Sequence, residues 1–235
     1  MVNLKQNDLR RTVTDEFPQN AVAADLRWKS FDYCYHYFLR TDLAKADPEK
    51  SCSALGWYLA SWGLLRPAPF AKDENCRYLP AIVNYIAGQD KKIWRLDVDR
   101  YTDENIAEIL AIHGEIQAII RRTTGQEAGV ARTTKILLGV FGFVPALDSR
   151  FVTTFRNIFR NREAFSRLDE ETLKLLRDFY QANQADINKL SGEFFTYDFL
   201  KDKPTGAQYP KIRIIDMYGY AKSARPRRQP AWSAN

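Results

Sequence analysis

The sequence predicts a mainly α-helical protein that folds as a single compact domain. Apolar residues recur at three- and four-residue spacing along most of the 235-residue chain, which is typical of helices that bury one face. The composition, with 45% hydrophobic and 27% charged residues, is that of a globular protein with a core. No internal repeat and no proline- or glycine-rich linker divides the chain. One short run, Ile212–Ile215, is strand-like, so we expect an all-α fold with a short irregular or β-containing segment near the carboxyl end.

The first half of the chain predicts three helical regions. Residues 20–40 are densely aromatic and form either one long helix or two short ones. Residues 51–65 carry small and apolar side chains all round, which indicates a buried helix that Pro67 and Pro69 terminate. A shorter helix is expected over residues 76–87. The expected division of the chain is an amino-terminal extension over residues 1–18, a helical domain over residues 19–220 and a basic, mobile tail over residues 221–235.

Capping and glycine signals place the helices of the second half. Thr102, with Asn105 three residues later, is a start signal for a helix whose apolar spacing continues through Arg122. Residues 123–125, Thr-Thr-Gly, break that helix, and Gly129 begins the next. The further expected helices cover residues 129–141, residues 148–161, a segment opened by residues 168–171, and residues 187–199.

The charge and the cysteine content limit which binding partners and which cellular compartment we expect. The 35 Lys and Arg residues exceed the 29 Asp and Glu residues, and the resulting net charge of +6 suits nucleic acid or another anionic surface. Cys34, Cys52 and Cys76 form no CxxC pair, so we expect a reducing cytoplasm and no disulfide scaffold. The polar residues 1–8 and the lack of any apolar run of about 18 residues predict neither a signal peptide nor a membrane span.

Several common chemistries have no sequence signal in this chain. It contains no Walker lysine loop, no GxGxxG after a strand and no GxSxG motif. Its two histidines, His36 and His113, lie in no zinc-binding pattern, so we expect no catalytic metal and treat both as surface or packed residues. A Cys34–His36 nucleophile is excluded because residues two apart point to different sides of a helix.

The most informative stretch is residues 129–151, GVARTTKILLGVFGFVPALDSRF. A Gly-Val-Ala turn opens an apolar helix, and a Gly-Phe-Val-Pro turn then leads to a lone carboxylate, Asp148, at the mouth of the next helix. Taken alone, Asp148 is a favoured N-cap, because its carboxylate accepts hydrogen bonds from free backbone N–H groups. The surrounding residues favour a functional role beside this structural one.

This stretch resembles the helix-hairpin-helix DNA glycosylase superfamily. Members carry a Gly-Val-Gly hairpin that opens a helix, a Gly-x-Pro-type turn and a Val-Asp-Thr-His/Arg-Val sequence. Here residues 129–134 match the hairpin, with Ala131 in place of the second glycine, and residues 147–151 match the aspartate segment. The resemblance implies that Asp148 is the catalytic carboxylate beside a base pocket. The contacts that it implies to double-stranded DNA involve Gly129, Arg132, Thr134, Lys135 and Arg150.

The residue at position 133 bears on the expected reaction. Members of the superfamily with lyase activity carry a nucleophilic lysine in the hairpin, where this chain has Thr133, and Lys135 lies roughly 200° away round a helix. The resemblance therefore implies a monofunctional enzyme that uses water and needs no cofactor. Such an enzyme flips the target base out of the duplex, and its carboxylate stabilises the positive charge that develops on the deoxyribose.

Aromatic and basic residues elsewhere are candidates for the wall of the base pocket. Tyr58, Trp62 and Arg66 lie at i, i+4 and i+8 on the buried helix. They form either a pocket wall in which Arg66 donates to the flipped base, or two core aromatics and an arginine that complements the helix dipole. On the first helix, Tyr35 is a further pocket candidate. Asp32 is either a second acid or, as we favour, a solvated surface carboxylate.

A second resemblance covers residues 32–70 and 134–148. A group of bacterial proteins shares a Leu-Ala-Ser-Trp-Gly-x-x-Arg helix, here residues 59–66, and a downstream Thr-Lys-Ile-Leu-Leu-Gly…Pro-Ala-x-Asp segment. Some are candidate phage-defence glycosylases for hypermodified bases, notably glucosylated hydroxymethylcytosine. Two alternatives stay open: a nucleic-acid-binding module without chemistry, and a helical protein-interaction or toxin–antitoxin component. The expected partner is double-stranded DNA, and we expect a monomer that does not bind a membrane.

Overall fold

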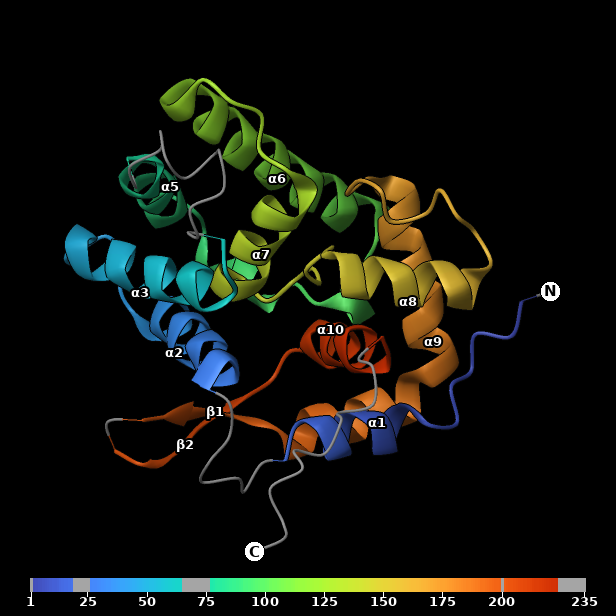
Figure 1. The fold of residues 1–235 in the computed structure, drawn as a ribbon. Coiled ribbons are helices and arrows are strands. Elements are labelled where there is room, and N and C mark those ends of the chain that lie inside the picture. Colours follow the sequence, from blue (N-terminus) through green and yellow to red (C-terminus); the bar gives the residue numbers. More distant parts are fainter. Residues whose placement is uncertain (1, 19–25, 65–76, 200, 224–235) are drawn as a thin grey trace, which may run out of the picture.

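The computed structural model describes residues 2–18, 26–64, 77–199 and 201–223, and it confirms a mainly helical chain (Figure 1). Within these residues the sheet structure is a single two-stranded hairpin. The elements in chain order are α1 (Leu9–Glu16), α2 (Leu26–Arg40), α3 (Pro48–Ser61), α5 (Tyr78–Ala87), the 3₁₀ helices η1 (Lys91–Arg95) and η2 (Val98–Arg100), α6 (Asp103–Thr124), α7 (Val130–Val140), α8 (Ser149–Phe159), α9 (Glu170–Glu193), β1 (Phe195–Asp198), β2 (Lys203–Gln208) and α10 (Lys211–Lys222).

Two helices, α7 and α10, lie in the middle of the fold (Figure 1). Helix α7 contacts α2, α3 and α6, whereas α10 contacts α1, α8 and α9. Every residue of α7 from Thr133 to Val140 is buried, and so is every residue of α10 from Ile212 to Gly219. A helix that is buried all round must be covered by neighbours on every side. The two helices thus form the core around which the other elements pack.

The amino-terminal residues belong to this core. Leu9 and Val13 of α1 are fully buried, and α1 packs against α10 and α9. Two ion pairs, Lys5–Asp186 at 2.8 Å and Arg10–Glu193 at 3.0 Å, join the same segment to α9. The sequence suggested an extension here, because a helix of eight residues gives too short a periodic pattern to stand out.

The carboxyl-terminal part differs from the sequence prediction in two ways. The predicted strand at Ile212–Ile215 is wrong, because these residues form the first turns of α10. The predicted helix over residues 187–199 ends at Glu193, where α9 stops, and Phe195–Asp198 form β1 instead. Strand β1 pairs antiparallel with β2. The expected β-containing segment is therefore this hairpin, which lies before α10.

Asp97 explains why the isoleucine-rich run is helical. Its carboxylate accepts hydrogen bonds from the backbone N–H groups of Lys211 at 2.7 Å and Ile212 at 2.9 Å, the first two residues of α10. The helix start is thus capped by a residue 114 positions earlier in the chain. The strand preference of β-branched residues is also a poor predictor for these isoleucines, because they are buried on all sides and their packing decides the conformation.

The two capping predictions are confirmed. The Thr102 side chain accepts from Asn105 N at 3.2 Å and begins α6, and the Asp148 side chain caps α8. Arg66 and Cys76, together with the basic run in residues 224–235, lie outside the described residues. None of the described helices combines the length and apolar character that crossing a membrane requires.

Candidate functional site

Asp148 lies where α7, α8 and α10 meet. As the N-cap of α8, its Oδ1 accepts hydrogen bonds from the backbone N–H groups of Arg150 and Phe151, both at 3.1 Å. Its Oδ2 accepts from Lys135 Nζ at 2.9 Å, and the aspartate side chain is 22% exposed. Asp148 therefore caps its helix, as the structural interpretation predicted, and it also belongs to an ion pair that still reaches solvent.

Lys135 faces inward from α7, which corrects its predicted role as a DNA contact. Its side chain is only 7% exposed. Its Nζ lies 4.5 Å from the centre of the Trp62 ring, so the ammonium is placed between a carboxylate and an aromatic ring. A lysine this deeply buried is held by its partners and does not reach a phosphate. The structure thus brings Lys135 and Asp148 together as one unit.

Hydrogen bonds hold the turn before Asp148 at the two residues that directly precede this aspartate. Ala146 N donates to Asp216 Oδ1 of α10 at 2.8 Å, and Leu147 N donates to Thr134 Oγ1 of α7 at 3.0 Å. Thr134 is fully buried, so its predicted contact to DNA is also wrong, and its hydroxyl instead positions the turn. Two consecutive backbone amides anchored by different helices fix the approach to Asp148.

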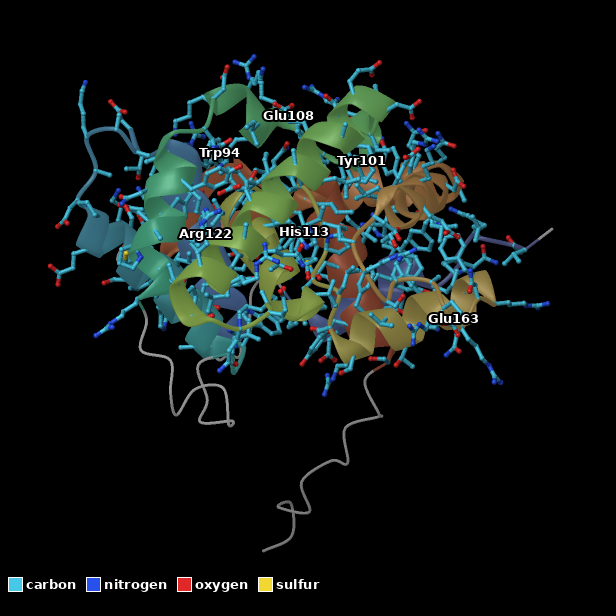
Figure 2. The ribbon with its side chains drawn as sticks, turned by 90° about the horizontal axis from the view of Figure 1, so that it is seen from above. Trp94, Tyr101, Glu108, His113, Arg122 and Glu163 are labelled. Carbon is cyan, nitrogen blue, oxygen red and sulfur yellow. The ribbon has the colours of Figure 1, made fainter. Side chains whose placement is uncertain are left out.

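Aromatic side chains fix the start of the same turn. Trp94 Nε1 donates to Val140 O at 2.8 Å, and the hydroxyl of Tyr101 donates to Phe143 O. Both aromatic residues are buried, and they lie along the same side of the molecule in Figure 2. These bonds satisfy carbonyl groups at the end of α7 that no helical partner reaches. The whole segment between α7 and α8 is therefore rigidly held.

A second buried ion pair lies next to the first. Asp216 forms a salt bridge with Arg213 one turn earlier in α10, and both side chains are almost fully buried. Burial raises the pKa of Asp216, while the positive charges of Arg213 and Lys135 lower it and the charge of Asp148 raises it. Sequence analysis missed this pair. Opposite charges three residues apart inside an apolar run were the available signal.

Two of the predicted pocket aromatics are core residues. Tyr58 is 1% exposed, and its ring lies so close to α7 that a Cβ at Gly139 would come within 2.6 Å of Tyr58 Cδ1. Tyr35 stacks on Phe31 with ring centres 5.4 Å apart and is 6% exposed. The core interpretation of Tyr58 is thus the correct one, and Tyr35 is likewise packed in the core.

Trp62 remains beside the ion pair and belongs to a small aromatic group. It is half-buried, and its ring packs edge-on against Tyr220 with ring centres 5.7 Å apart. The guanidinium of Arg150 in turn lies 4.4 Å from the centre of the Tyr220 ring. A chain of contacts thus leads from Lys135 through Trp62 and Tyr220 to the exposed Arg150.

The remaining predicted DNA contacts lie at the surface. Gly129 is the exposed N-cap of α7 and has no side chain to satisfy the free N–H groups of the helix start. Arg132 is half-buried, with its guanidinium 5.9 Å from the centre of the Tyr78 ring. Arg150 is exposed at the start of α8. Of these three residues, Arg150 is the one that lies next to Asp148, to which its backbone N–H donates.

Asp32 is buried, so the prediction of a solvated surface carboxylate is wrong. The Tyr209 hydroxyl donates to its Oδ1, and Tyr197 N donates to its Oδ2 at 3.2 Å. Burial raises the pKa of Asp32 to about 6, although these bonds and the charges of Lys29 and Arg213 oppose the rise. Its partners come from the other end of the chain, which no local pattern indicates.

The histidines carry no sign of a metal site. His113 is packed between α6 and α7 (Figure 2), where its Nε2 lies 3.0 Å from Thr133 Oγ1. Burial lowers its pKa to about 4. Within the ranges that the structure describes, no group of three His, Cys, Asp or Glu side chains is placed to hold a metal ion.

Comparison with known protein families, curated proteins and solved structures finds no match to this chain.

Proposed function

We propose that this protein is a DNA glycosylase that hydrolyses an N-glycosidic bond with Asp148 as its catalytic carboxylate. The observation that carries the proposal is the Lys135–Asp148 pair at 2.9 Å, in which the carboxylate keeps 22% of its side chain exposed beside Trp62. The rigid turn around it supports the same role, because a catalytic group must be held in place by its neighbours. The net charge of +6 suits a polyanionic substrate.

The chemistry that we propose is hydrolysis at C1′ of a flipped nucleotide. The base leaves with the electron pair of the C1′–N bond, and the carboxylate stabilises the positive charge that develops on the sugar. A water oxygen then bonds to C1′, its proton passes through the carboxylate, and the departing base takes up a proton. Lys135 balances the charge of Asp148 before substrate binds, and the Trp62 and Tyr220 rings offer faces on which a flipped base stacks.

The substrate class that we propose is duplex DNA with a modified or damaged base. Hypermodified cytosine of phage DNA is the specific member suggested by the sequence resemblance. The informative experiment incubates the protein with phage DNAs that differ in base modification and counts abasic sites. We expect one modification class to give abasic sites and unmodified DNA to give none.

The Asp148→Asn variant tests the residue assignment. Asparagine keeps the size and part of the capping ability of aspartate, so the protein should fold and bind DNA while base release falls at least a hundredfold. Asp186→Asn is the matched control, because it removes an exposed carboxylate that also pairs with a lysine. Full base release by Asp148→Asn refutes the assignment. DNA binding without base release by the wild-type protein favours a binding module.

One observation favours a second candidate, a glycosylase that also cleaves the strand. The amine of Lys135 lies beside the Asp148 carboxylate, although the lyase members of the superfamily carry their lysine at the place that Thr133 occupies here. In this reaction the amine nitrogen bonds to C1′ as the base leaves, and the resulting imine permits β-elimination of the 3′ phosphate. Borohydride reduction would then trap a protein–DNA adduct that Lys135→Met cannot form. Intact abasic strands and no adduct support the hydrolytic reaction.

A further inference from the structure

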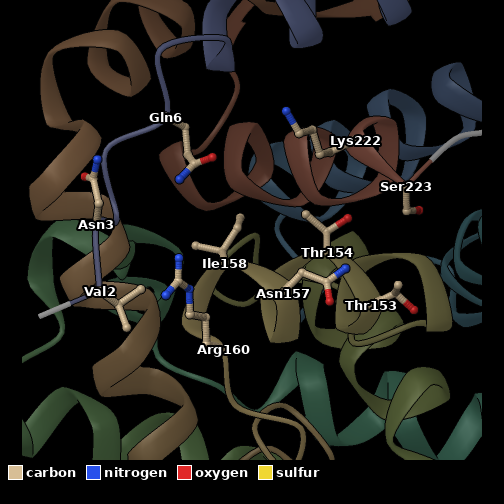
Figure 3. Close-up of a pocket in the computed structure, with 10 residues that line it drawn as sticks. All are labelled: Val2, Asn3, Gln6, Thr153, Thr154, Asn157, Ile158, Arg160, Lys222 and Ser223. Carbon is tan, nitrogen blue, oxygen red and sulfur yellow. The ribbon is translucent and has the colours of Figure 1, made fainter.

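A groove lies between α8, the amino-terminal segment and the end of α10 (Figure 3). Its volume is about 440 Å³, and its walls come from three segments that are distant in the sequence. These are the amino-terminal residues 2–6, the outer face of α8, and the end of α10 at Lys222 and Ser223. The groove is open to solvent, and both polar and apolar side chains line it.

The groove carries positive charge. In Figure 3 the guanidinium of Arg160 points up from the α8 wall, and Lys222 lies on the opposite wall. Lys222 is paired with Asp8, whose carboxylate also accepts from the Tyr218 hydroxyl at 3.1 Å. Within the described part of the chain, the side chains of Arg160 and Asn157 make no hydrogen bond or ion pair. Their donors are therefore free to bind an anion.

The backbone at Arg160 is unusual for an arginine. Its φ of 51° and ψ of 35° place it in the left-handed region at the C-cap of α8, where glycine is the favoured residue. An L-residue with a Cβ is strained in this region. Glycine would end the helix without this strain but would have no charge to offer the groove. Arginine at this position therefore accepts a strained backbone and supplies a guanidinium to the groove.

Arg160 ends a polar stripe that begins beside Asp148. The exposed residues Arg150, Thr153, Asn157 and Arg160 follow one another at offsets of three, seven and ten, which keeps them on one face of α8. At 1.5 Å per residue the two arginines are separated by roughly 15 Å along the helix. Duplex DNA rises about 3.4 Å per base pair, so the stripe matches roughly four base-pair steps.

We propose that this stripe and the groove at its end bind the phosphodiester backbone of the DNA strand that presents its nucleotide to Asp148, with Arg150 and Arg160 contacting phosphates about four nucleotides apart. The proposal rests on the proposed function for its substrate. Arginine is suited to the role because its planar guanidinium donates two parallel hydrogen bonds to a phosphate. Such contacts set the register of the protein on the duplex and carry no base specificity.

The test measures the affinity for an unmodified duplex at several salt concentrations. Each phosphate contact adds about one unit to the slope of log K against log salt, so Arg160→Gln should lower the slope by about one. Arg150→Gln combined with Arg160→Gln should lower it by about two. Arg95→Gln is the matched control, because Arg95 is an exposed arginine of η1 on another part of the surface. This control should leave the slope unchanged.

A second variant separates binding from folding. Arg160→Gly relaxes the left-handed backbone, so it should show the same loss of slope together with an equal or higher unfolding temperature. The proposal is overturned by an unchanged slope in both Arg160 variants. It is equally overturned if wild-type protein fails to bind the duplex, or if the Arg160 variants lose binding to phosphatidylserine vesicles and keep binding to DNA.

The outcome is distinguishable from failure of the proposed function. Unmodified duplex requires no base release, so the salt slope is measured independently of the glycosidic reaction. If no DNA yields abasic sites while the Arg160 variants lose their slope, the glycosylase proposal fails and the backbone site stands. If base release occurs with an unchanged slope, the glycosylase stands and the backbone site fails.

Discussion

Replacing Lys135 with methionine leaves the charge of Asp148 without its counterion in a largely buried place. At 2.9 Å and an effective dielectric constant of about 20, two unit charges attract by ~6 kcal/mol before desolvation is counted. Removing one partner of a fully buried pair costs about 3–5 kcal/mol. Because Asp148 is 22% exposed, water compensates part of this loss, so we expect Lys135→Met to lower the unfolding free energy by about 2–4 kcal/mol.

A double-mutant cycle in urea measures the pair itself. Methionine keeps the length and apolar stem of lysine, and Asp148→Asn removes the charge that Lys135→Met strands. The double variant should therefore lose at least ~1 kcal/mol less than the sum of the single losses. The control cycle is Lys5→Met with Asp186→Asn, a pair at 2.8 Å whose side chains are 43% and 34% exposed. Its coupling should stay below about 1 kcal/mol. Additive losses at Lys135 and Asp148 would refute the reasoning.

Two further predictions concern the core. Burial raises the pKa of Asp32 in the folded protein to about 6, above its ordinary value of 3.8, so its protonated form stabilises the fold below pH 4 and this contribution is lost as the pH rises through 6. Between pH 4 and pH 7 the free energy of unfolding should therefore fall by ~3 kcal/mol. Urea midpoints measured over this range should show the fall in the wild-type protein and not in Asp32→Asn. An identical pH dependence in both proteins contradicts the assignment. Gly139→Ala should destabilise the protein by about 1–3 kcal/mol, because its Cβ meets the Tyr58 ring. The control Gly192→Ala, a helical site with open space, should stabilise it by up to ~1 kcal/mol, and a calorimetric result of the same sign for both variants contradicts the packing.

Features set by neighbouring residues could be predicted from the sequence. The helix starts at Thr102 and Asp148 depend on hydrogen bonds to residues two or three positions away, so their signals lie in the local sequence. The same holds for the glycine break at Gly125, which adopts a φ of 73° at the end of α6. A local hydrogen bond leaves a local pattern, and such patterns placed most of the helices.

Features set by distant residues could not be predicted in this way. The start of α10 depends on Asp97, and the burial of Asp32 depends on Tyr209. The inward direction of Lys135 had a weaker but readable signal. A single lysine inside the apolar run after Thr134 has no polar face to occupy, so it must pair with a buried acid. Arg213 and Asp216 gave the same signal in α10.

Helix α8 joins the proposed chemistry and the proposed backbone site in one rigid element. Its N-cap is Asp148, and its other end is Arg160. The helix lies so close to α10 that a Cβ at Gly219 would come within 2.9 Å of the Phe151 ring, and Thr154 Oγ1 donates to Gly219 O at 2.8 Å. Because Asp148 and Arg160 cap the two ends of the same helix, the spacing of their backbones is set by α8 itself, and the contacts with α10 hold that helix in place. A phosphate bound at Arg160 would thus select which nucleotide of the strand reaches Asp148.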